Sequence, residues 1–590
     1  MNNESKSIWK KNLRTPGLLL AWAILAVVIM IIITIYLAMT GQSMGKDDNF
    51  IAMIIFACVI PTLVVGLWMF IRWIRNWRNF KRFVFGVACL ATFIALFYAE
   101  EDWRSLHALN EFKQQLAAKN EKFDFKDLIP APVPDDQNFA LAPIVYSSYG
   151  QILTRDGQEI PSEKRDTNFV NRLQMPTTLD NDSPTNDGGR WDVARLTNLK
   201  PWQSYYRDLT AKTNLFPVSP QPQSPAADVL LALSKYDSQI EELRAASRLP
   251  YSRFPVDYSK DEPAAILLPH LAMMKSCLQV LRLRATAELQ NGEADKAAED
   301  IKLMLYLTQS LRTEPILISH LVRIAMAAIT LQPVYDGLAE HRWNDAELAS
   351  LDTELSKFDF LADYEFAMHG EMSFGLAETE YLRRSRNFQA LDYDESGGHN
   401  SEASHWGLRL APASLFYWNE LTIAQMHEQW TLPLVDAQKQ IVHANAVRDN
   451  DAAVLKQLQR GWPYNFLARM IFPAVRKSVV KFARAQSSLD LARTAIALER
   501  YRLAHGEYPE ALDALAPQFM DKVPHDIIGG QPLHYQRTSD GQFVLYSVGW
   551  NGIDDGGVVA FKNTGRDPRD ESSSTVDIEK GDWVWRYPPK

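Results

Sequence analysis

The sequence predicts a multi-pass membrane anchor followed by a mainly α soluble region, in which an irregular helical bundle leads into a small α+β head. Three observations predict this fold class. The first hundred residues contain three long apolar runs. In the middle of the chain apolar residues recur three and four positions apart, the period of an α-helix. From about residue 530 they alternate instead, which is the period of a β-strand.

The membrane anchor is predicted from the runs 18–39, 50–71 and 83–98. The first run is uncharged, and at about 1.5 Å per residue it is long enough to cross a hydrocarbon core of about 30 Å. Pro61 is compatible with the second run because membrane helices tolerate a kink. A secretory signal peptide is the alternative for the first run, but the run is too long for a signal core and further spans follow it. We therefore expect three transmembrane helices within residues 1–99.

Charged residues beside the runs predict the orientation of the anchor. Short cytoplasmic loops carry an excess of Lys and Arg, so we expect a bacterial inner-membrane protein with a cytoplasmic N-terminus and with residues after about 100 extracytoplasmic. Basic residues precede the first run and follow the second, and acidic residues follow the third. They are Lys6, Lys10, Lys11, Arg14, Arg72, Arg75, Arg78, Lys81 and Arg82, and then Glu100, Glu101 and Asp102.

Composition limits the class of protein. The 590 residues are 47% hydrophobic and 23% charged, which is enough apolar material for a sizeable core. The net charge of -9 offers no basic field for nucleic acid, so the expected partners are membrane lipid and other envelope proteins. Of the three cysteines only Cys277 lies outside the predicted spans, which excludes an intrachain disulfide and a cysteine-rich zinc site in the soluble region.

The soluble region is divided by its local patterns into four parts. Residues 100–225 form an amphipathic helix to about 119 and then an irregular connector rich in Pro, Asn and Asp, which either wraps a neighbouring domain through its aromatic residues or is partly mobile. Its acids Asp180, Asp182 and Asp187 do not have EF-hand spacing, which favours a solvated loop over a calcium site. Three parts follow the connector. They are a helical bundle (226–390), a loop with further helices (391–475) and the head (476–590).

Helices of the bundle are predicted from apolar stripes and from their end signals. A long helix opened by Pro263 has a stripe from 266 to 283 and ends at Asn291-Gly292. A second helix covers 293–311, and Pro315 opens a third. The turn at 288–301 resembles the inter-helix turn of tetratricopeptide-type repeats, but it occurs once, which favours an irregular bundle. Helical pattern resumes at about Tyr417 through Val442, and again after Pro473 as far as Tyr501.

Candidate catalytic residues lie on one predicted helix. Glu365 and His369 are an i,i+4 pair able to share a helix face, and Glu371 follows, a spacing that suits half of a metal site. His399 and His405 flank a Gly-Ser-Asn loop, and His427-Glu428 belongs to the next helical region. The sequence lacks HExxH, GxSxG and the glycine-rich nucleotide motifs in a supporting context, so helix-surface pairing is favoured over catalysis. His270 and His320 lie on apolar faces and are typical of core histidines.

The head is predicted from a change of period after a long helix. Gly506 is a stop signal for that helix, Pro509 starts a short helix, and Asp540-Gly541 forms the turn of a hairpin between 533–537 and 542–548. Alternation at 583–587 predicts a closing strand. We therefore expect a long helix with a small antiparallel sheet packed on it.

Residues 488–557 resemble the globular head of type II secretion major pseudopilins. The matching motifs are the helix exit at 495–509, the Pro-x-Asp-x-x-Gly-x-Pro segment at 524–532 and the S-x-G-x-x-G loop at 547–552. The resemblance covers about an eighth of the chain, and a single hydrophobic helix does not lead directly into this head as it does in that family. It implies a calcium ion in the last loop, with Asp554, Asp555 and Asn551 as ligands, and a tight turn is the alternative.

The whole arrangement resembles large bacterial membrane-anchored proteins that carry such a head, a resemblance that implies no activity. The sequence therefore predicts a noncatalytic inner-membrane protein that presents an extracytoplasmic helical and pseudopilin-like interaction domain in envelope assembly or secretion. The alternative is an envelope enzyme with a Glu/His site in the helical domain.

Overall fold

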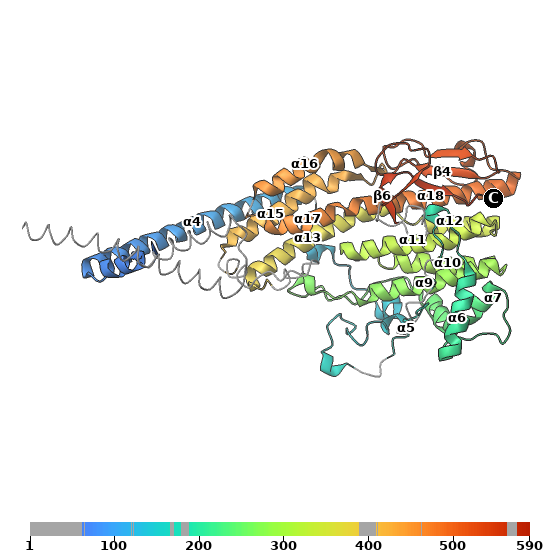
Figure 1. Ribbon diagram of the computed structural model, residues 1–590, viewed down its shortest axis with the longest axis horizontal. Helices are drawn as coiled ribbons and strands as arrows, with labels where there is room; N and C mark the ends of the chain where they lie inside the picture. The colour runs from blue at the N-terminus through green and yellow to red at the C-terminus, as the bar shows by residue number, and fades with distance from the viewer. Residues whose placement is uncertain are drawn as a thin grey trace, which may run out of the picture. The chain divides into compact units, whose positions relative to one another are not determined.

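A computed structural model describes residues 62–63, 65–119, 121, 123–165, 170–178, 184, 188–388, 409, 411–461, 463–562 and 575–589 (Figure 1). In this part the protein is mainly helical, with a few small antiparallel sheets. The chain forms two compact units, Met1–Glu101 and Asp102–Lys590, and we call the second unit the body. The expected span 18–39, most of 50–71, the acids Asp180, Asp182 and Asp187, and His399 and His405 lie outside the described residues.

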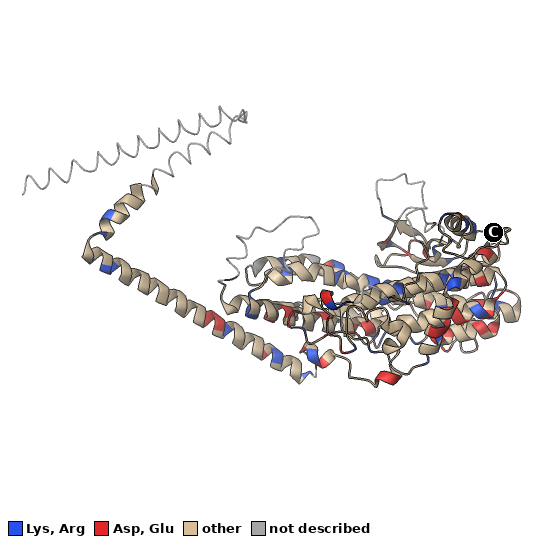
Figure 2. Ribbon diagram, turned by 90° about the horizontal axis from the view of Figure 1, so that it is seen from below, with Lys and Arg blue, Asp and Glu red and all other residues tan. Residues whose placement is uncertain are grey.

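The expected third span and the amphipathic helix after it form one continuous helix, α4 (Trp77–Ala118). Its apolar half carries no charge between the basic residues at its start and the acidic residues further along (Figure 2). Large apolar side chains are exposed there, with Phe85 at 71%, Phe93 at 68% and Leu96 at 65%. By length and composition α4 is one of two described helices that could cross a membrane.

The other such helix is α11 (Leu317–Ala339), and its surroundings are different. In α4 none of the apolar window is buried, whereas 61% of the apolar window of α11 is buried inside the body. It contacts α9 (Pro269–Gln290), α10 (Ala294–Gln309) and α18 (Ser478–His505). We therefore treat α11 as a core helix of the body.

The connector after α4 packs on the rest of the body through its aromatic residues. Trp191, Trp202 and Tyr206 are all at most 9% exposed, so the described part of the connector follows the wrapping alternative. It also contains a regular helix that the sequence analysis did not predict, α6 (Leu199–Thr213), capped by the Asn198 side chain. The shorter elements are η1 (Phe125–Leu128), η2 (Asp135–Gln137), η3 (Phe139–Leu141), α5 (Pro143–Tyr146), η4 (Ser162–Lys164) and η6 (Trp191–Val193).

The helical bundle follows the expected stripes, with one difference at its first long helix. Pro269 rather than Pro263 occupies the first turn of α9, while Pro263 opens the separate 3-10 helix η8 (Pro263–Ala265). The predicted stop at Asn291-Gly292 is confirmed, since α9 ends at Gln290 and Gly292 has a φ of 83°. Helices α9, α10 and α11 lie side by side (Figure 1). The remaining elements are α7 (Pro225–Leu233), η7 (Ser234–Tyr236), α8 (Asp237–Ala246), α12 (Asp345–Leu355) and α13 (Phe360–Ser385).

The expectation of helix through Val442 is wrong in its second half. Helix α15 (Ala413–Trp430) ends early, and η10 (Leu432–Leu434) leads into a hairpin of β1 (Val435–Asp436) and β2 (Ile441–Val442). Pro433 removes a backbone donor and the strands contain β-branched residues, which together disfavour a continued helix. Helix α16 (Ala444–Arg460) was not predicted, and Pro473 lies inside α17 (Phe466–Arg476) rather than before a helix.

The C-terminal part is a long helix, α18, with antiparallel strands packed on it. Gly506 ends α18 with a φ of 86°, and the Asp540-Gly541 turn joins β3 (His534–Arg537) to β4 (Phe543–Ser547), as expected. Strand β7 (Trp583–Arg586) pairs with β4, giving the order β3-β4-β7, while β5 (Val559–Phe561) pairs with β6 (Val576–Gly581). Pro509 does not start a helix, and the 3-10 helix η11 covers Leu512–Leu515 instead.

A single hydrophobic core joins the bundle to the strands. It includes Leu305 of α10, Tyr335 of α11, Tyr364 of α13, Leu498 of α18 and Trp585 of β7, all at most 2% exposed. The elements predicted as bundle and head therefore share buried contacts.

Candidate functional site

The structure separates the three residues that the sequence analysis placed together on α13. His369 is partly buried, and its Nδ1 donates to the backbone carbonyl of Glu365 at 2.9 Å, one turn earlier. The Glu365 side chain itself is exposed. Glu371 follows two positions later and so points to another side of the helix, where burial raises its pKa to about 7. Neither carboxylate forms a site with His369.

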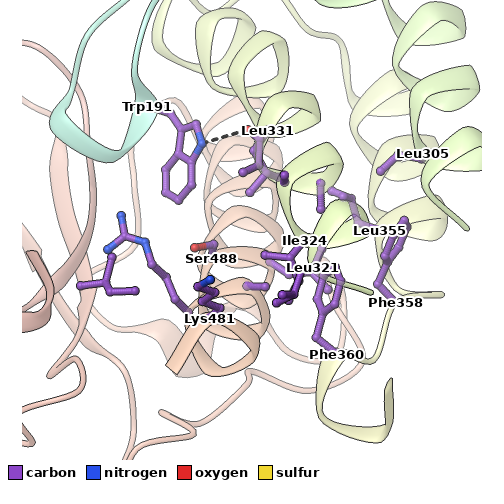
Figure 3. A pocket seen from close by; sticks show the side chains of 17 residues that line it. Trp191, Leu305, Leu321, Ile324, Leu331, Leu355, Phe358, Phe360, Lys481 and Ser488 are labelled. Carbon is purple, nitrogen blue, oxygen red and sulfur yellow. Dashed lines mark hydrogen bonds between the residues drawn. The ribbon is translucent and has the colours of Figure 1, made fainter. Parts of the chain in front are cut away.

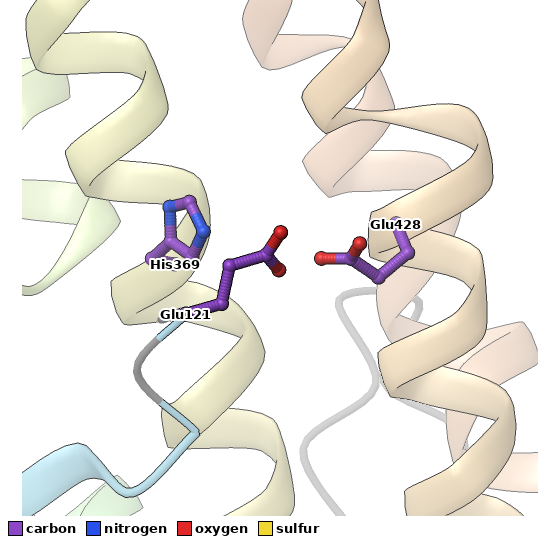
Figure 4. A group of neighbouring side chains, drawn as sticks. All are labelled: Glu121, His369 and Glu428. Atoms are coloured by element: carbon purple, nitrogen blue, oxygen red, sulfur yellow. The ribbon is translucent and has the colours of Figure 1, made fainter. Parts of the chain in front are cut away.

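His369 meets two other carboxylates instead, Glu121 and Glu428. One potential ligand atom from each of the three side chains lies within 4.8 Å of the other two. Glu428 is on α15 and Glu121 follows the end of α4. Figure 4 shows the Glu121 carboxylate between the imidazole and the carboxylate of Glu428. His369 and Glu428 were recognisable in the sequence as candidate residues, whereas Glu121 was not.

The end of α4 positions Glu121. The backbone N–H groups of Lys119 and Glu121 both donate to the carbonyl of Leu116, at 2.9 and 3.1 Å, so the chain turns back at the end of the helix. The Leu116 side chain is 1% exposed. Phe123 then packs on a hydrophobic cluster between α13 and α15. Leu116 and Phe123 are thus anchored on either side of Glu121, and the Glu121 carboxylate is directed into the space between α13 and α15.

Two carboxylate oxygens of this group are buried without a hydrogen bond in the described part of the chain, Oε2 of Glu121 and Oε1 of Glu428. The other oxygen of Glu428 lies 3.3 Å from Nζ of Lys119. Burial, together with the neighbouring Glu428, raises the pKa of Glu121 well above its ordinary value. Buried, unpaired carboxylate oxygens are costly, so the group favours a bound proton or a bound cation.

The donor set suits a divalent metal ion that accepts nitrogen and oxygen ligands, such as zinc, manganese or ferrous iron. The bond from His369 Nδ1 to a backbone carbonyl directs the lone pair of Nε2 away from its own helix, which is the usual support of a metal-bound histidine. Two ligands of one zinc ion lie at most about 4.2 Å apart. Binding would therefore draw the three side chains slightly closer together.

The C-terminal loop uses its candidate calcium ligands in contacts within the head. Asn551 Nδ2 donates to Asp555 at 2.8 Å, and Asp554 accepts from the Tyr546 hydroxyl at 3.1 Å and from the Gly556 N–H at 2.9 Å. The Gly556 hydrogen bond lowers the pKa of Asp554. These contacts match the tight-turn alternative for this loop.

Asp582 organises the same loop, and the sequence analysis did not single it out. Its carboxylate accepts from the backbone N–H groups of Asp555 at 3.2 Å, Gly557 at 2.7 Å and Val558 at 3.3 Å. Asp582 comes directly before β7, far along the chain from the loop it holds, so no local motif marks it.

The two histidines expected in the core are buried there with partners. His270 Nε2 lies 2.7 Å from Glu314 Oε1, and His320 Nε2 lies 3.0 Å from the Glu314 carbonyl. Burial, helped by the nearby Arg323, lowers the pKa of His320 to about 4. Both histidines are therefore explained by packing and hydrogen bonding.

The chain matches no family model, no curated protein and no solved structure. The geometry of Glu121, His369 and Glu428 is thus the basis of the function proposed below.

Proposed function

We propose that this chain is a noncatalytic, membrane-anchored protein of the bacterial inner membrane, and that its body lies outside the cytoplasm, where it presents an interaction surface to other envelope proteins. The exposed apolar half of α4 supports the anchor, because a charge-free helix of this kind needs a cover of lipid or protein. Basic residues before it and acidic residues after it support the orientation.

A divalent metal ion held by Glu121, His369 and Glu428 is the second part of this proposal. It rests on one observation, the convergence of an imidazole and two carboxylates with unpaired buried oxygens. Because Glu121 follows α4 while the other two residues lie on α13 and α15, the ion would fasten the end of α4 to these two helices. Its role in this reading is structural.

The head completes the proposal. Its resemblance to type II secretion major pseudopilins suggests that the surface around β3, β4 and the 547–557 loop contacts other proteins of envelope assembly or secretion. In that family a single hydrophobic helix leads directly into the head, whereas here it does not. This difference argues against incorporation of the protein into a pilus.

Membrane topology can be tested with reporters on the intact chain. We expect alkaline phosphatase fused after Lys590 to be active, and a green fluorescent protein that folds only in the cytosol to stay dark at the same position. The opposite result would place the body in the cytoplasm and overturn the orientation.

Metal content of the purified full chain tests the second part. We expect about one equivalent of a divalent transition metal per chain, and its loss in His369→Ala and Glu428→Gln. Glu111→Gln is the control, since that side chain is exposed on α4 and is not one of the three ligands, and it should keep the metal. Equal metal content in all four proteins would exclude the site, and circular dichroism would show whether each variant is folded.

An envelope metalloenzyme is the second candidate function. Three protein ligands leave a fourth position on zinc, the arrangement of catalytic zinc sites. This alternative predicts metal-dependent hydrolysis of model ester or peptide substrates that disappears in Glu428→Gln. A protein that binds metal but hydrolyses none of them would favour the structural role.

A further inference from the structure

A cavity of about 320 Å³ lies between α11 and α18, in a different part of the body from the candidate metal site. Phe358, which precedes α13, and Phe360, its first residue, close one side of it, and Trp191 of the connector closes another (Figure 3). Ligand pockets usually have volumes of roughly 300–1,000 Å³. The volume of this cavity is at the lower end of that range, which suits one hydrocarbon chain rather than two.

Most of the cavity wall is apolar, and α11 supplies a large part of it. Leu321, Ala325 and Ala328 recur at helical spacing and line it. One turn before Leu321 on the same face is Ile318, whose side chain is 54% exposed. The apolar stripe of α11 therefore runs from the inside of the cavity to the surface.

The polar groups of the cavity gather on α18. Lys481, Arg484 and Ser488 follow one another at single helical turns, and all three line the cavity. In Figure 3 the lysine and the serine are on the α18 side, opposite Leu321 and Ile324 of α11. The cavity thus has an apolar side and a cationic side.

The two cations that line the cavity, Lys481 and Arg484, differ in their ion pairing. Arg484 Nη2 lies 3.1 Å from Asp192, but the same carboxylate also accepts from Arg190 at 3.2 Å. Lys481 is exposed and has no ion pair among the described residues. Arg484 is therefore ion-paired, whereas Lys481 places a positive charge without a described ion pair beside the apolar cavity.

We infer that this cavity binds a single-chain anionic amphiphile, with its hydrocarbon chain along α11 and its carboxylate or phosphate head group at Lys481. A head group of this charge pairs with the exposed ammonium of Lys481 at the polar side of the cavity. The hydrocarbon chain fills the apolar part of the cavity and contacts its apolar walls. The inference does not depend on the proposed metal site or on the orientation of the protein in the membrane.

Binding can be measured on the full chain in nanodiscs of zwitterionic lipid. The probe is cis-parinaric acid, a fluorescent long-chain fatty acid, titrated against matched protein-free nanodiscs to subtract partitioning. Lysophosphatidylglycerol and hexadecanol serve as competitors, the first with a phosphate head group and the second without charge. The affinities of the fatty acid and of the two competitors are then compared. The ligand with the highest affinity identifies the head group that the protein prefers.

We expect saturable binding of one probe per chain. Lys481→Glu should weaken it about tenfold, whereas Lys477→Glu, an exposed lysine one turn earlier that does not line the cavity, should leave it unchanged. Ala325→Trp, which places an indole in the cavity, should abolish it, and Ala346→Trp on the exposed surface of α12 is its control.

Several results would overturn the inference. One is the absence of saturable binding above the protein-free nanodiscs. Another is equal affinity in Lys481→Glu and Lys477→Glu, or displacement by hexadecanol as strong as by lysophosphatidylglycerol, since either would show that charge is not recognised. Lys481 is on the surface, so its substitution tests the inference even if Ala325→Trp does not fold.

Discussion

Single buried charges in α18 show how strongly the surroundings of a residue set its chemistry. The Glu499 carboxylate is fully buried and accepts from Arg502 at 2.7 and 2.9 Å, from His341 at 2.9 Å and from the Tyr508 hydroxyl at 2.9 Å. Burial alone would raise its pKa, but the hydrogen bonds from Arg502 and His341 outweigh burial and hold the pKa at about 2. Asp490, two and a half turns earlier, has no comparable cation, and burial raises its pKa to about 7.

Glu499→Gln should destabilise the body at pH 7 by about 2–4 kcal/mol, because Arg502 and His341 lose their charged acceptor. The folded pKa lies below the unfolded value of about 4.5, so the carboxylate contributes stability that is present above that pH and is lost as the pH falls toward 2. Thermal melting at pH 7 and pH 3 should show a difference between wild type and variant that shrinks at the lower pH. Glu510→Gln, at an exposed position, should change stability by less than about 0.5 kcal/mol. A similar loss in both variants would refute the argument.

Asp490→Asn should have the opposite sign. Because its folded pKa is above the unfolded one, Asp490 costs stability progressively as the pH rises from about 4 to 7, by up to about 1.4 kcal/mol per pH unit. The variant should melt at a higher temperature than wild type at pH 8 and at nearly the same temperature at pH 4. Gln486 donates to Asp490 at 3.1 Å, and the amide oxygen of asparagine can accept the same bond. A variant that is less stable than wild type at pH 8 would contradict this prediction.

At the scale of elements, the close approach of α13 to the chain before α11 depends on a glycine. A Cβ atom added to Gly370 would lie 1.9 Å from the carbonyl oxygen of Pro315, a backbone atom that cannot move aside alone. At Gly375, on the same helix, the nearest atom would be a methyl carbon of Ile423 at 3.4 Å, which is an ordinary contact. The two positions therefore form a matched pair.

Gly370→Ala should destabilise the protein by at least about 2 kcal/mol through overpacking. Gly375→Ala should be neutral or stabilising by up to about 1 kcal/mol, because alanine favours a helix over glycine. Thermal melting of the two variants beside wild type checks both. Equal effects at the two glycines would show that α13 does not approach Pro315 this closely.

Helix ends and turns that are marked by their own residues could be predicted from the sequence. Elements that are held in place by residues far away in the chain could not. Asn291-Gly292, Gly506 and Asp540-Gly541 mark ends and turns by their own conformational preferences, and the structure places them as expected. The strands β1 and β2 are only two residues long, and Val442 is bridged to Ile528 from the head. No local pattern encodes such a partner.

The candidate metal site was half predictable for the same reason. His369 was singled out because residues with metal-ligand chemistry surround it on its own helix. Its partners in the structure come from the end of α4 and from α15, so their proximity is a result of packing. Glu121 is one acid in a charged stretch of the sequence, and only the turn after Leu116 directs it toward His369.

At the scale of the whole body, the shared core predicts that the C-terminal part does not fold alone. Helix α18 buries Leu489 and Leu498 in a cluster that includes Leu338 and Tyr364 of the bundle. A fragment of residues 476–590 would expose this face, so we expect it to aggregate or to unfold without a cooperative transition, whereas 102–590 should unfold cooperatively. Circular dichroism and size-exclusion chromatography compare the two. A soluble, cooperatively folded 476–590 fragment would show that the head is independent.

The rings of Trp191 and Trp585 are in contact, with their centroids 5.6 Å apart, and this contact affects how the body folds. It closes a loop of roughly 390 residues, so Trp191 has no native neighbour on that side until β7 is in place. During synthesis the surface that β7 will cover is exposed to water until the last residues of the chain are made. We expect such a chain to bind holding chaperones while it is incomplete.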